Sequence, residues 1–262
     1  MELIVIGAGP AYTDRRGAAA SAYLLTADGA ALLLDLGQGA FANLASAMEP
    51  SALTAVLVSH LHPDHFVDLV PLRHYLTWEF NPPRRTRVLG PAGLADRLDS
   101  LNGHPGFSAT SLDIEALSEG SHRIGPFEVE ALRVAHTSES YAFRVTCAAA
   151  SDGSTTTRGR AAEPLPALVY SGDCARAEDL LPLIHPGDTL LSEASFGAGP
   201  VVPGAQHITA RDAATVAATG GASRLLLTHV LSGHSRTEII IGARAAFDGP
   251  VQLVTEGDRF AI

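Results

Sequence analysis

The sequence predicts an α/β protein in which two layers of strands are packed between two layers of helices. Short runs of Leu and β-branched residues recur from one end of the chain to the other, and amphipathic stretches separate many of them. This alternation is typical of a four-layered αββα sandwich. At 262 residues, with 46% hydrophobic and 18% charged residues, the chain can form a single domain over residues 1–262 around a large core.

The predicted elements follow this pattern in chain order. Strands are expected at Leu3–Ile6, Ala22–Leu25, Ala31–Leu36, Ala55–Ser59, Arg87–Gly90, Phe127–Val134, Ala142–Cys147, Ala167–Ser171, Thr189–Ser192, Arg224–Thr228 and Val251–Thr255. Helices are expected at Asp64–Trp78, Gly93–Leu101, Arg176–Ile184, Ala210–Ala218 and Thr237–Phe247. Pro63 opens the first helix, and Thr209 with Asp212 resembles a capping box. The Ala-, Ser-, Thr- and Gly-rich segment Ala148–Glu163 is predicted to be the tip of a hairpin.

Charge and cysteine content argue against several classes of protein. A net charge of -10 and a pI near 5.5 disfavour stable binding to nucleic acid, which depends on clustered basic residues. Cys147 and Cys174 form no CxxC pair, so neither a disulfide framework nor a thiolate zinc site is indicated. The segment Met1–Gly7 does not resemble a secretory signal, and no apolar run is long enough to cross a membrane. A cytoplasmic location is therefore expected.

The densest group of chemically active residues follows the predicted strand Ala55–Ser59. The segment that ends this strand reads Ser-His-Leu-His-Pro-Asp-His and contains His60, His62, Asp64 and His65. Imidazole binds zinc, iron, nickel or copper, and carboxylate extends the range to manganese. A solvated polar loop would explain one or two of these residues, but the complete HxHxDH pattern favours a metal site.

Further candidate ligands follow other predicted strands. His136, Asp173 and His229 each come after an apolar strand. A single His or Asp in such a place is usually an ordinary loop residue. Two metal ions, however, need ligands from several segments of the chain. The three residues together with the histidine-rich loop therefore indicate a dinuclear site.

These motifs resemble those of the metallo-β-lactamase superfamily, whose members bind two metal ions through HxHxDH, a later His, a bridging Asp and a final His. The order and spacing agree over nearly the whole chain. The resemblance implies a first ion held by His60, His62 and His136, a second held by Asp64, His65 and His229, and a bridge formed by Asp173. Two divalent ions are expected, with zinc favoured and manganese as the alternative. Asp35, in a turn that resembles the family's DxGxG, is expected only to support the ligands.

A finer resemblance, to the ribonuclease Z-like branch of the superfamily, is carried by Leu191–Phe196 and His207–Thr209. It implies that His207 donates a proton to the leaving oxygen and that Glu193 orients this imidazole and raises its pKa. We expect Asp64 to hold the attacking hydroxide, so that the three residues catalyse the hydrolysis of a phosphodiester. Without Glu193, the favoured interpretation of His207 would be an exposed residue that precedes a helix.

The substrate is expected to be a small phosphodiester. Members that process tRNA carry a long basic arm, whereas Ala148–Glu163 has only two arginines and the chain is acidic. The segments Ala135–Tyr141 and Leu227–His229 are similar to actinobacterial cyclic-nucleotide phosphodiesterases, which implies a cyclic nucleotide such as cyclic AMP. The alternatives are a ribonuclease Z-like endonuclease acting at RNA 3′ ends and a lactonase or thioesterase, with a non-catalytic metabolite-binding protein ranked last.

Several other side chains are weaker candidates. Tyr75, Trp78 and Phe80 are able to stack on a nucleobase, but a place in the core or at an interface is the favoured interpretation. His104 fits an ordinary turn better than a substrate loop. The aromatic helix Asp64–Trp78 also offers a face for a homodimer.

Overall fold

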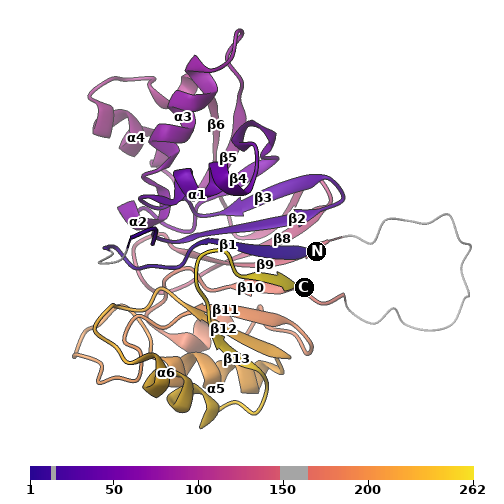
Figure 1. Ribbon diagram of the computed structural model, residues 1–262, viewed down its shortest axis with the longest axis vertical. Coiled ribbons are helices and arrows are strands. Elements are labelled where there is room, and N and C mark those ends of the chain that lie inside the picture. The colour runs from indigo at the N-terminus through magenta and orange to yellow at the C-terminus, as the bar shows by residue number, and fades with distance from the viewer. Residues whose placement is uncertain (13–15, 148–164) are drawn as a thin grey trace, which may run out of the picture.

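The computed structural model describes residues 1–12, 16–147 and 165–262, which form two seven-stranded sheets packed face to face (Figure 1). The first sheet has the order β14-β1-β2-β3-β4-β5-β6, and the second has the order β13-β12-β11-β10-β9-β8-β7. The first sheet contains β1 (Glu2–Gly7), β2 (Ala22–Ala27), β3 (Ala30–Leu34), β4 (Ala55–Leu57), β5 (Thr86–Gly90), β6 (Leu112–Ala116) and β14 (Arg259–Ala261). The second contains β7 (Gly120–Ile124), β8 (Phe127–Arg133), β9 (Tyr141–Cys147), β10 (Leu168–Tyr170), β11 (Thr189–Glu193), β12 (Arg224–Thr228) and β13 (Val251–Leu253).

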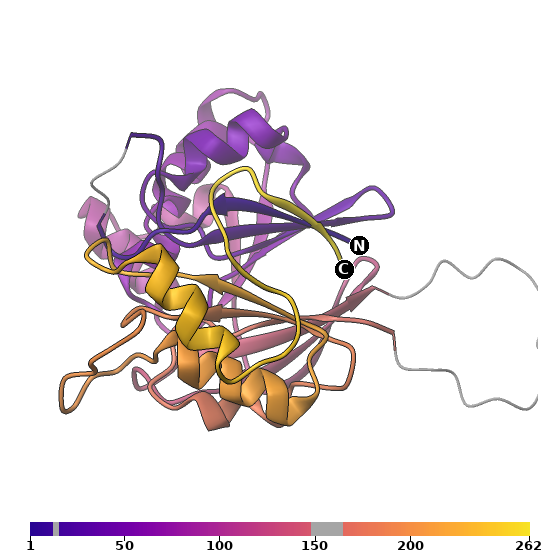
Figure 2. The same cartoon turned by 60° about the horizontal axis from the view of Figure 1, so that its bottom comes forward.

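Helices cover the outer faces of both sheets. Beside the first sheet lie α1 (Ala40–Ala47), α2 (Pro63–Phe66), α3 (Leu69–Trp78) and α4 (Leu94–Asn102). Against the second sheet pack α5 (Ala210–Gly220) and α6 (Arg236–Arg244), which lie side by side in Figure 2. The predicted αββα arrangement is confirmed.

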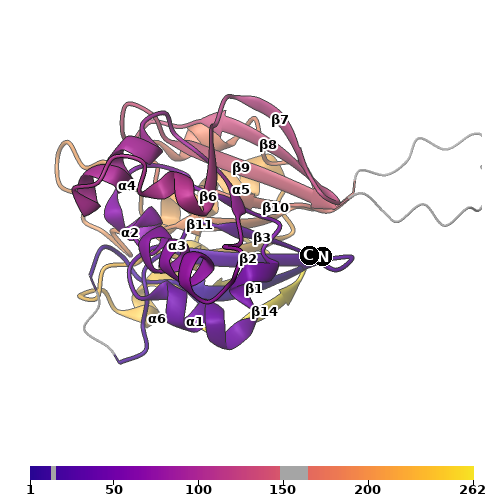
Figure 3. The same ribbon diagram turned by 90° about the horizontal axis from the view of Figure 1, so that it is seen from above.

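The alternation of side chains along β1 shows how the layers are held together. Leu3 and Val5 belong to the core between the two sheets, whereas Ile4 and Ile6 belong to the core between the first sheet and its helices. Successive side chains of a strand point to opposite faces, so a strand covered on both faces is apolar throughout. The two chain ends lie side by side because β14 pairs with β1 (Figure 3).

Strand direction sets the position of the candidate site. Strands β3 to β6 run parallel, and so do strands β10 to β13. Parallel strands place their carboxyl ends at one edge of a sheet, where α/β proteins bind their ligands. In both sheets this edge carries the polar residues that follow the apolar strands.

The structure corrects some of the predicted elements. The expected helix Asp64–Trp78 is divided into α2 and α3, and at the break the carboxylate of Asp68 accepts a hydrogen bond from Phe41 N at 2.9 Å. The segment Arg176–Ile184 forms only a 3₁₀ turn over Ala177–Leu180. Helix α1 and strands β6, β7 and β14 were not predicted, while the capping box of Thr209 and Asp212 is present.

The predicted hairpin tip Ala148–Glu163 lies outside the described residues, but the strands on either side of it, β9 and β10, pair antiparallel. None of the described helices has both the length and the hydropathy needed to cross a membrane.

Candidate metal centre

The seven predicted metal ligands come together at the carboxyl ends of the strands. His60 and His62 follow β4, and Asp64 and His65 lie in the four residues of α2. The remaining three residues follow β8, β10 and β12 and are His136, Asp173 and His229. One group of ligand atoms within 4.8 Å of one another comes from His60, His62, His136 and Asp173, and a second such group comes from Asp64, His65, Asp173 and His229.

Asp173 lies at the centre of both groups. Its Oδ2 is 3.3 Å from Nε2 of His65 and 3.7 Å from Nε2 of His60. The same oxygen is 3.7 Å from Nε2 of His136 and 3.7 Å from Nε2 of His229. This position, shared by four imidazoles, is the one that a carboxylate bridging two ions requires.

Hydrogen bonds on the outer nitrogens orient four of the imidazoles. His65 Nδ1 donates to the Asp35 carboxylate at 2.7 Å, and His136 Nδ1 donates to the carbonyl of Gln206 at 2.7 Å. His60 Nδ1 lies 3.1 Å from Ser59 Oγ, and His229 Nδ1 lies 2.9 Å from Ser195 Oγ. A proton on Nδ1 leaves Nε2 deprotonated and directed at the centre, which is the tautomer a metal ligand needs.

Asp35 is the main supporting residue beneath this cluster. It is fully buried, and its carboxylate accepts hydrogen bonds from Ser59 N at 2.7 Å, Ser59 Oγ at 2.8 Å and Tyr170 Oη at 2.6 Å, in addition to the bond from His65. The expectation that Asp35 supports the ligands is confirmed. Tyr170, which the sequence did not single out, is part of the same support.

The cluster also passes a test of fit for metal ions. In the described chain, His60 Nε2, His65 Nε2 and Asp173 Oδ1 are buried and have no hydrogen-bond partner. Buried polar atoms without partners are costly in a folded protein, and ion coordination removes that cost. His62 Nδ1 lies 3.1 Å from His136 Nε2. Two nitrogens bound to one tetrahedral zinc ion at about 2.0–2.1 Å would be roughly 3.3 Å apart, so this separation fits a shared ion.

The charges in the cluster perturb one another strongly. Burial would raise the pKa of Asp173, but the adjacent imidazoles of His229, His65 and His60 hold it well below its usual range. Burial would lower the pKa of His65, but the carboxylates of Asp173 and Asp35 raise it well above 6.5. Burial dominates at His60, whose pKa falls well below 6.5. Opposed shifts in one buried cluster are typical of functional sites.

The backbone is strained at two points of the site. In the described residues, non-glycine residues with positive φ are Asp28, Asp35 (59°) and His229 (56°). Such conformations cost ~1–3 kcal/mol each and collect at functional sites. Close backbone packing adds a further constraint, since a Cβ on Gly37 would lie 1.9 Å from the carbonyl oxygen of Asp64.

Glu193 and His207 form a separate pair next to the second group of ligands. Glu193 ends β11, is 1% exposed and approaches His207 Nδ1 with both carboxylate oxygens at 3.1 Å. Burial would lower the pKa of His207, but the hydrogen bond and charge of Glu193, with the charge of Asp173, raise it. His207 therefore holds a proton to a higher pH than a free imidazole.

Ser195 connects this pair to the metal cluster, a connection that the sequence did not reveal. Its hydroxyl donates to Glu193 Oε2 at 2.6 Å and lies 2.9 Å from His229 Nδ1 and 3.2 Å from His207 Nδ1. Glu193 also accepts from Cys174 N at 2.7 Å. The carboxylate is thus fixed by groups on both sides, and His207 is held in one orientation.

The weaker candidates lie on or after α3 and after α4, not on the segments that carry the ligands. Tyr75 Oη donates to Glu49 at 2.6 Å, and its ring packs against Phe80. Trp78 is 75% exposed at the end of α3, whose ten residues extend about 15 Å. His104 lies in the loop after α4 and belongs to neither group of ligands.

Comparison with known proteins supports this interpretation of the fold and site. The family model for the beta-lactamase superfamily domain matches residues 32–230 of the sequence, and this range contains every candidate ligand. The chain belongs to the metallo-β-lactamase superfamily. Among superfamily relatives, an uncharacterised protein of Mycobacterium leprae is 32% identical over 252 residues, covering 93% of this chain and 82% of the relative. A ribonuclease Z of Haloarcula marismortui is 28% identical over 90% of this chain and 89% of the relative.

Solved structures of the superfamily have the same fold as this chain. The metallo-β-lactamase fold protein YhfI of Bacillus subtilis has a TM-score of 0.83 and 25% identity, with 99% of both chains covered. A diphosphatase of the PhnP family has a TM-score of 0.73 at 14% identity, covering 100% of this chain and 97% of that one, and shows the fold alone. The chain is thus a metallohydrolase of the metallo-β-lactamase superfamily, with ribonuclease Z among its relatives.

Proposed function

We propose that this protein is a dinuclear metal-dependent phosphodiesterase that hydrolyses a small phosphodiester, with a cyclic nucleotide such as cyclic AMP as the substrate. The observation that carries this proposal is the Glu193–His207 pair beside the ligand cluster. An ester that releases an alkoxide needs a proton donor, whereas a thioester, which releases a less basic thiolate, has less use for one. A protonated imidazole held next to the candidate metal ions supplies that donor.

The candidate ligands would hold two metal ions, and Asp64 would also contact the attacking water. His60, His62 and His136 would hold one ion, Asp64, His65 and His229 the other, and Asp173 both. Bound there, two divalent ions lower the pKa of an attacking water toward neutrality and neutralise negative charge on the phosphoryl group. Asp64 is 5% exposed and lies beside His229, so its carboxylate is placed to accept a hydrogen bond from the attacking water.

His207 completes the reaction at the leaving oxygen. It is 25% exposed, so it is reachable by a substrate, while Glu193 behind it is buried. Protonation of the departing alkoxide by His207 leaves a neutral imidazole. Glu193 then favours recovery of the proton from solvent, because its negative charge stabilises the imidazolium.

The metal is proposed to be zinc, with manganese as the alternative. The donor set contains five imidazoles and two carboxylates, and imidazole-rich sites suit zinc. Carboxylates in both groups also accommodate manganese.

A ribonuclease Z-like activity on RNA is the second candidate, because one relative of similar length is a ribonuclease Z. The net charge of -10 argues for a small substrate, since a polyanion would be repelled except at the metal centre. We therefore rank the small phosphodiester first.

A substrate screen tests the proposal. The protein is loaded in turn with zinc and with manganese and assayed against bis-p-nitrophenyl phosphate, 3′,5′-cyclic AMP, a single-stranded RNA and a panel of lactones and thioesters. Metal-dependent hydrolysis of the first two substrates is expected. Turnover of the lactones or thioesters without either phosphodiester would contradict the proposal.

A further inference from the structure

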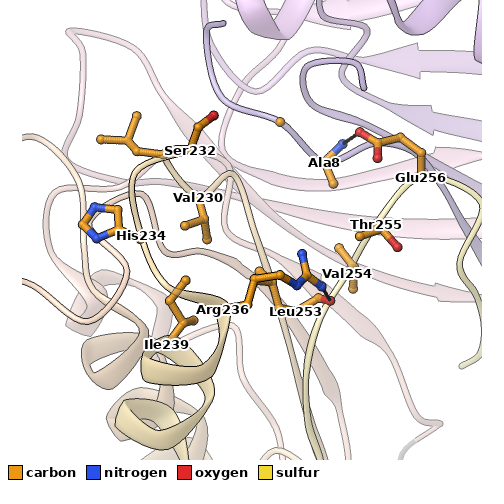
Figure 4. Close-up of a pocket in the computed structure, with 12 residues that line it drawn as sticks. Ala8, Val230, Ser232, His234, Arg236, Ile239, Leu253, Val254, Thr255 and Glu256 are labelled. Atoms are coloured by element: carbon orange, nitrogen blue, oxygen red, sulfur yellow. Dashed lines mark hydrogen bonds between the residues drawn. The ribbon is translucent and has the colours of Figure 1, made fainter. Parts of the chain in front are cut away.

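A cavity of about 240 Å³ is lined in part by Val230, the residue that follows the candidate ligand His229 (Figure 4). It is enclosed by the segment after β1, the loop between β12 and α6, and the segment after β13. His229 N donates to the carbonyl of Ala8 at 3.0 Å, and Val230 is the next residue. Ala8 and Val230 both line the cavity, so the cavity borders the two residues that adjoin the backbone of a candidate metal ligand.

The cavity, termed the Arg236–Glu256 pocket, has both polar and apolar side chains in its lining. Figure 4 shows Ser232 on one side, Glu256 on the other and Arg236 between them. The apolar part of the lining is formed by Val230, Leu231, Ile239, Leu253 and Val254. Polar atoms form slightly more than half of the accessible lining, so a ligand that fills the pocket needs hydrogen-bonding groups as well as an apolar face.

The polar groups of the pocket have spare hydrogen-bonding capacity. Glu256 Oε1 accepts from the amides of Ala8 at 3.4 Å and Ala19 at 3.2 Å, while Arg236 donates one bond, to the carbonyl of Leu253 at 3.0 Å. Over residues 1–12, 16–147 and 165–262, neither Arg236 nor Glu256 forms an ion pair. In the same residues, Ser232 Oγ is buried and has no partner.

The opposite charges of Arg236 and Glu256 limit the classes of ligand that the pocket can bind. An anion attracted by Arg236 would meet the carboxylate of Glu256, and a cation would meet the guanidinium, so neither gains much net attraction. A neutral, flat ligand with donors on one edge and acceptors on another satisfies both groups. Its apolar faces would contact the Val and Leu side chains. A nucleobase has this chemistry.

We infer that the Arg236–Glu256 pocket binds the nucleobase of the substrate, with an exocyclic amine or ring N–H donating to Glu256 and a ring nitrogen or carbonyl accepting from Arg236. The inference rests on the proposed function for its choice of ligand. It places the phosphodiester at the metal cluster and the base beyond His229. The volume of the pocket suits one base and its sugar edge, which favours a mononucleotide over a longer chain.

Two substitutions test the pocket through substrate preference. Glu256→Gln keeps an oxygen for the two amides and removes the charge, and Arg236→Ala removes the guanidinium. Asp248→Asn and Arg244→Ala are the matched controls, because both side chains are exposed and neither lines the pocket. In each pocket variant, kcat/KM for cyclic AMP is expected to fall about tenfold or more relative to kcat/KM for bis-p-nitrophenyl phosphate, which has no base. A ratio that stays within about twofold of the parent in both variants would overturn the inference.

Adenosine binding separates failure of the inference from failure of the proposed function. By calorimetry, adenosine is expected to bind the parent protein and the two controls, and about tenfold more weakly to Glu256→Gln. Binding without any phosphodiesterase activity would reject the proposed function and keep the pocket. Hydrolysis of cyclic AMP without adenosine binding at millimolar concentration would reject the pocket and keep the proposed function.

Discussion

The role assigned to His207 is the part of the proposed mechanism that a single substitution isolates best. The imidazole donates to a buried carboxylate and is absent from both groups of metal ligands that share Asp173. His207→Ala should therefore remove the proton donor and leave the candidate metal ions in place. General acid catalysis contributes roughly 10²- to 10⁴-fold, so kcat for cyclic AMP is expected to fall by at least about 100-fold.

Glu193→Gln should have a smaller effect in the same direction. It removes the negative charge but keeps the shape of the side chain. The loss of one hydrogen bond between charged groups is worth ~1.5–3 kcal/mol, or roughly 10- to 100-fold in rate. The pKa of His207 is raised because Glu193 outweighs burial. Since the acid must be protonated, the activity of the parent falls as pH rises through that pKa, and Glu193→Gln should move this fall to lower pH.

The assay compares leaving groups. Cyclic AMP releases an alkoxide that needs a proton, whereas bis-p-nitrophenyl phosphate releases a stabilised phenolate that needs none. The loss caused by His207→Ala should therefore be at least tenfold larger on cyclic AMP than on the aryl ester. His122→Ala, on the edge strand β7, is the control. Full turnover of cyclic AMP by His207→Ala, or equal losses on both substrates at unchanged metal content, would refute the role of His207 as an acid.

Three further perturbations probe the support beneath the metal cluster. Asp35→Asn should weaken zinc binding about 10- to 100-fold, because an amide cannot accept every bond that this carboxylate accepts, and zinc competition with a chelating dye measures the change. Gly37→Ala should lower metal content and the melting temperature, because its Cβ would collide with the Asp64 carbonyl, and elemental analysis with thermal unfolding follows both. Zinc binding to the metal-free protein at pH 7 should release protons and become stronger as pH rises. The reason is that the carboxylates of Asp173 and Asp35 outweigh burial and raise the pKa of His65 well above 6.5, so zinc must displace a proton from this imidazole. Calorimetry in buffers of different ionisation enthalpy measures the number of protons released.

Each of these expectations has an outcome that contradicts it. Unchanged zinc affinity in Asp35→Asn would show that the hydrogen bond to His65 does not matter for binding. For Gly37→Ala the control is Gly242→Ala on α6, where a Cβ meets nothing within 4 Å, and equal behaviour of the two variants would remove the steric argument. A binding enthalpy that does not depend on the buffer would mean that His65 is neutral before the ion arrives.

The sequence predicted the layers and the cluster because both depend on local patterns. An apolar run long enough for a buried strand, followed by a ligand-type residue, identifies the end of the strand at which that residue lies. His136, Asp173 and His229 were found in this way, and the parallel strands bring two of them to the same edge. Glu193 and His207 were found only through their resemblance to a motif, since neither is unusual by itself.

The features that were missed depend on contacts between distant segments. Ser195 is one of many serines, and only the fold brings its hydroxyl to His229, 34 residues away. Tyr170 reaches Asp35 across the two sheets, over a separation of 135 residues. No local signal reports such pairings. The break between α2 and α3, in contrast, has a local signal, because Pro71 lies in the first turn of α3 and a proline inside a helical pattern favours a helix end before it.

The number of metal ions that activity requires tests the central claim most directly. Metal-free protein is titrated with zinc while hydrolysis of bis-p-nitrophenyl phosphate and bound zinc are measured on the same samples. The dinuclear account predicts that activity rises until two ions are bound per chain and then reaches a plateau, and that Asp173→Asn binds fewer ions and stays inactive. Full activity with one ion per chain, or without any, would contradict it.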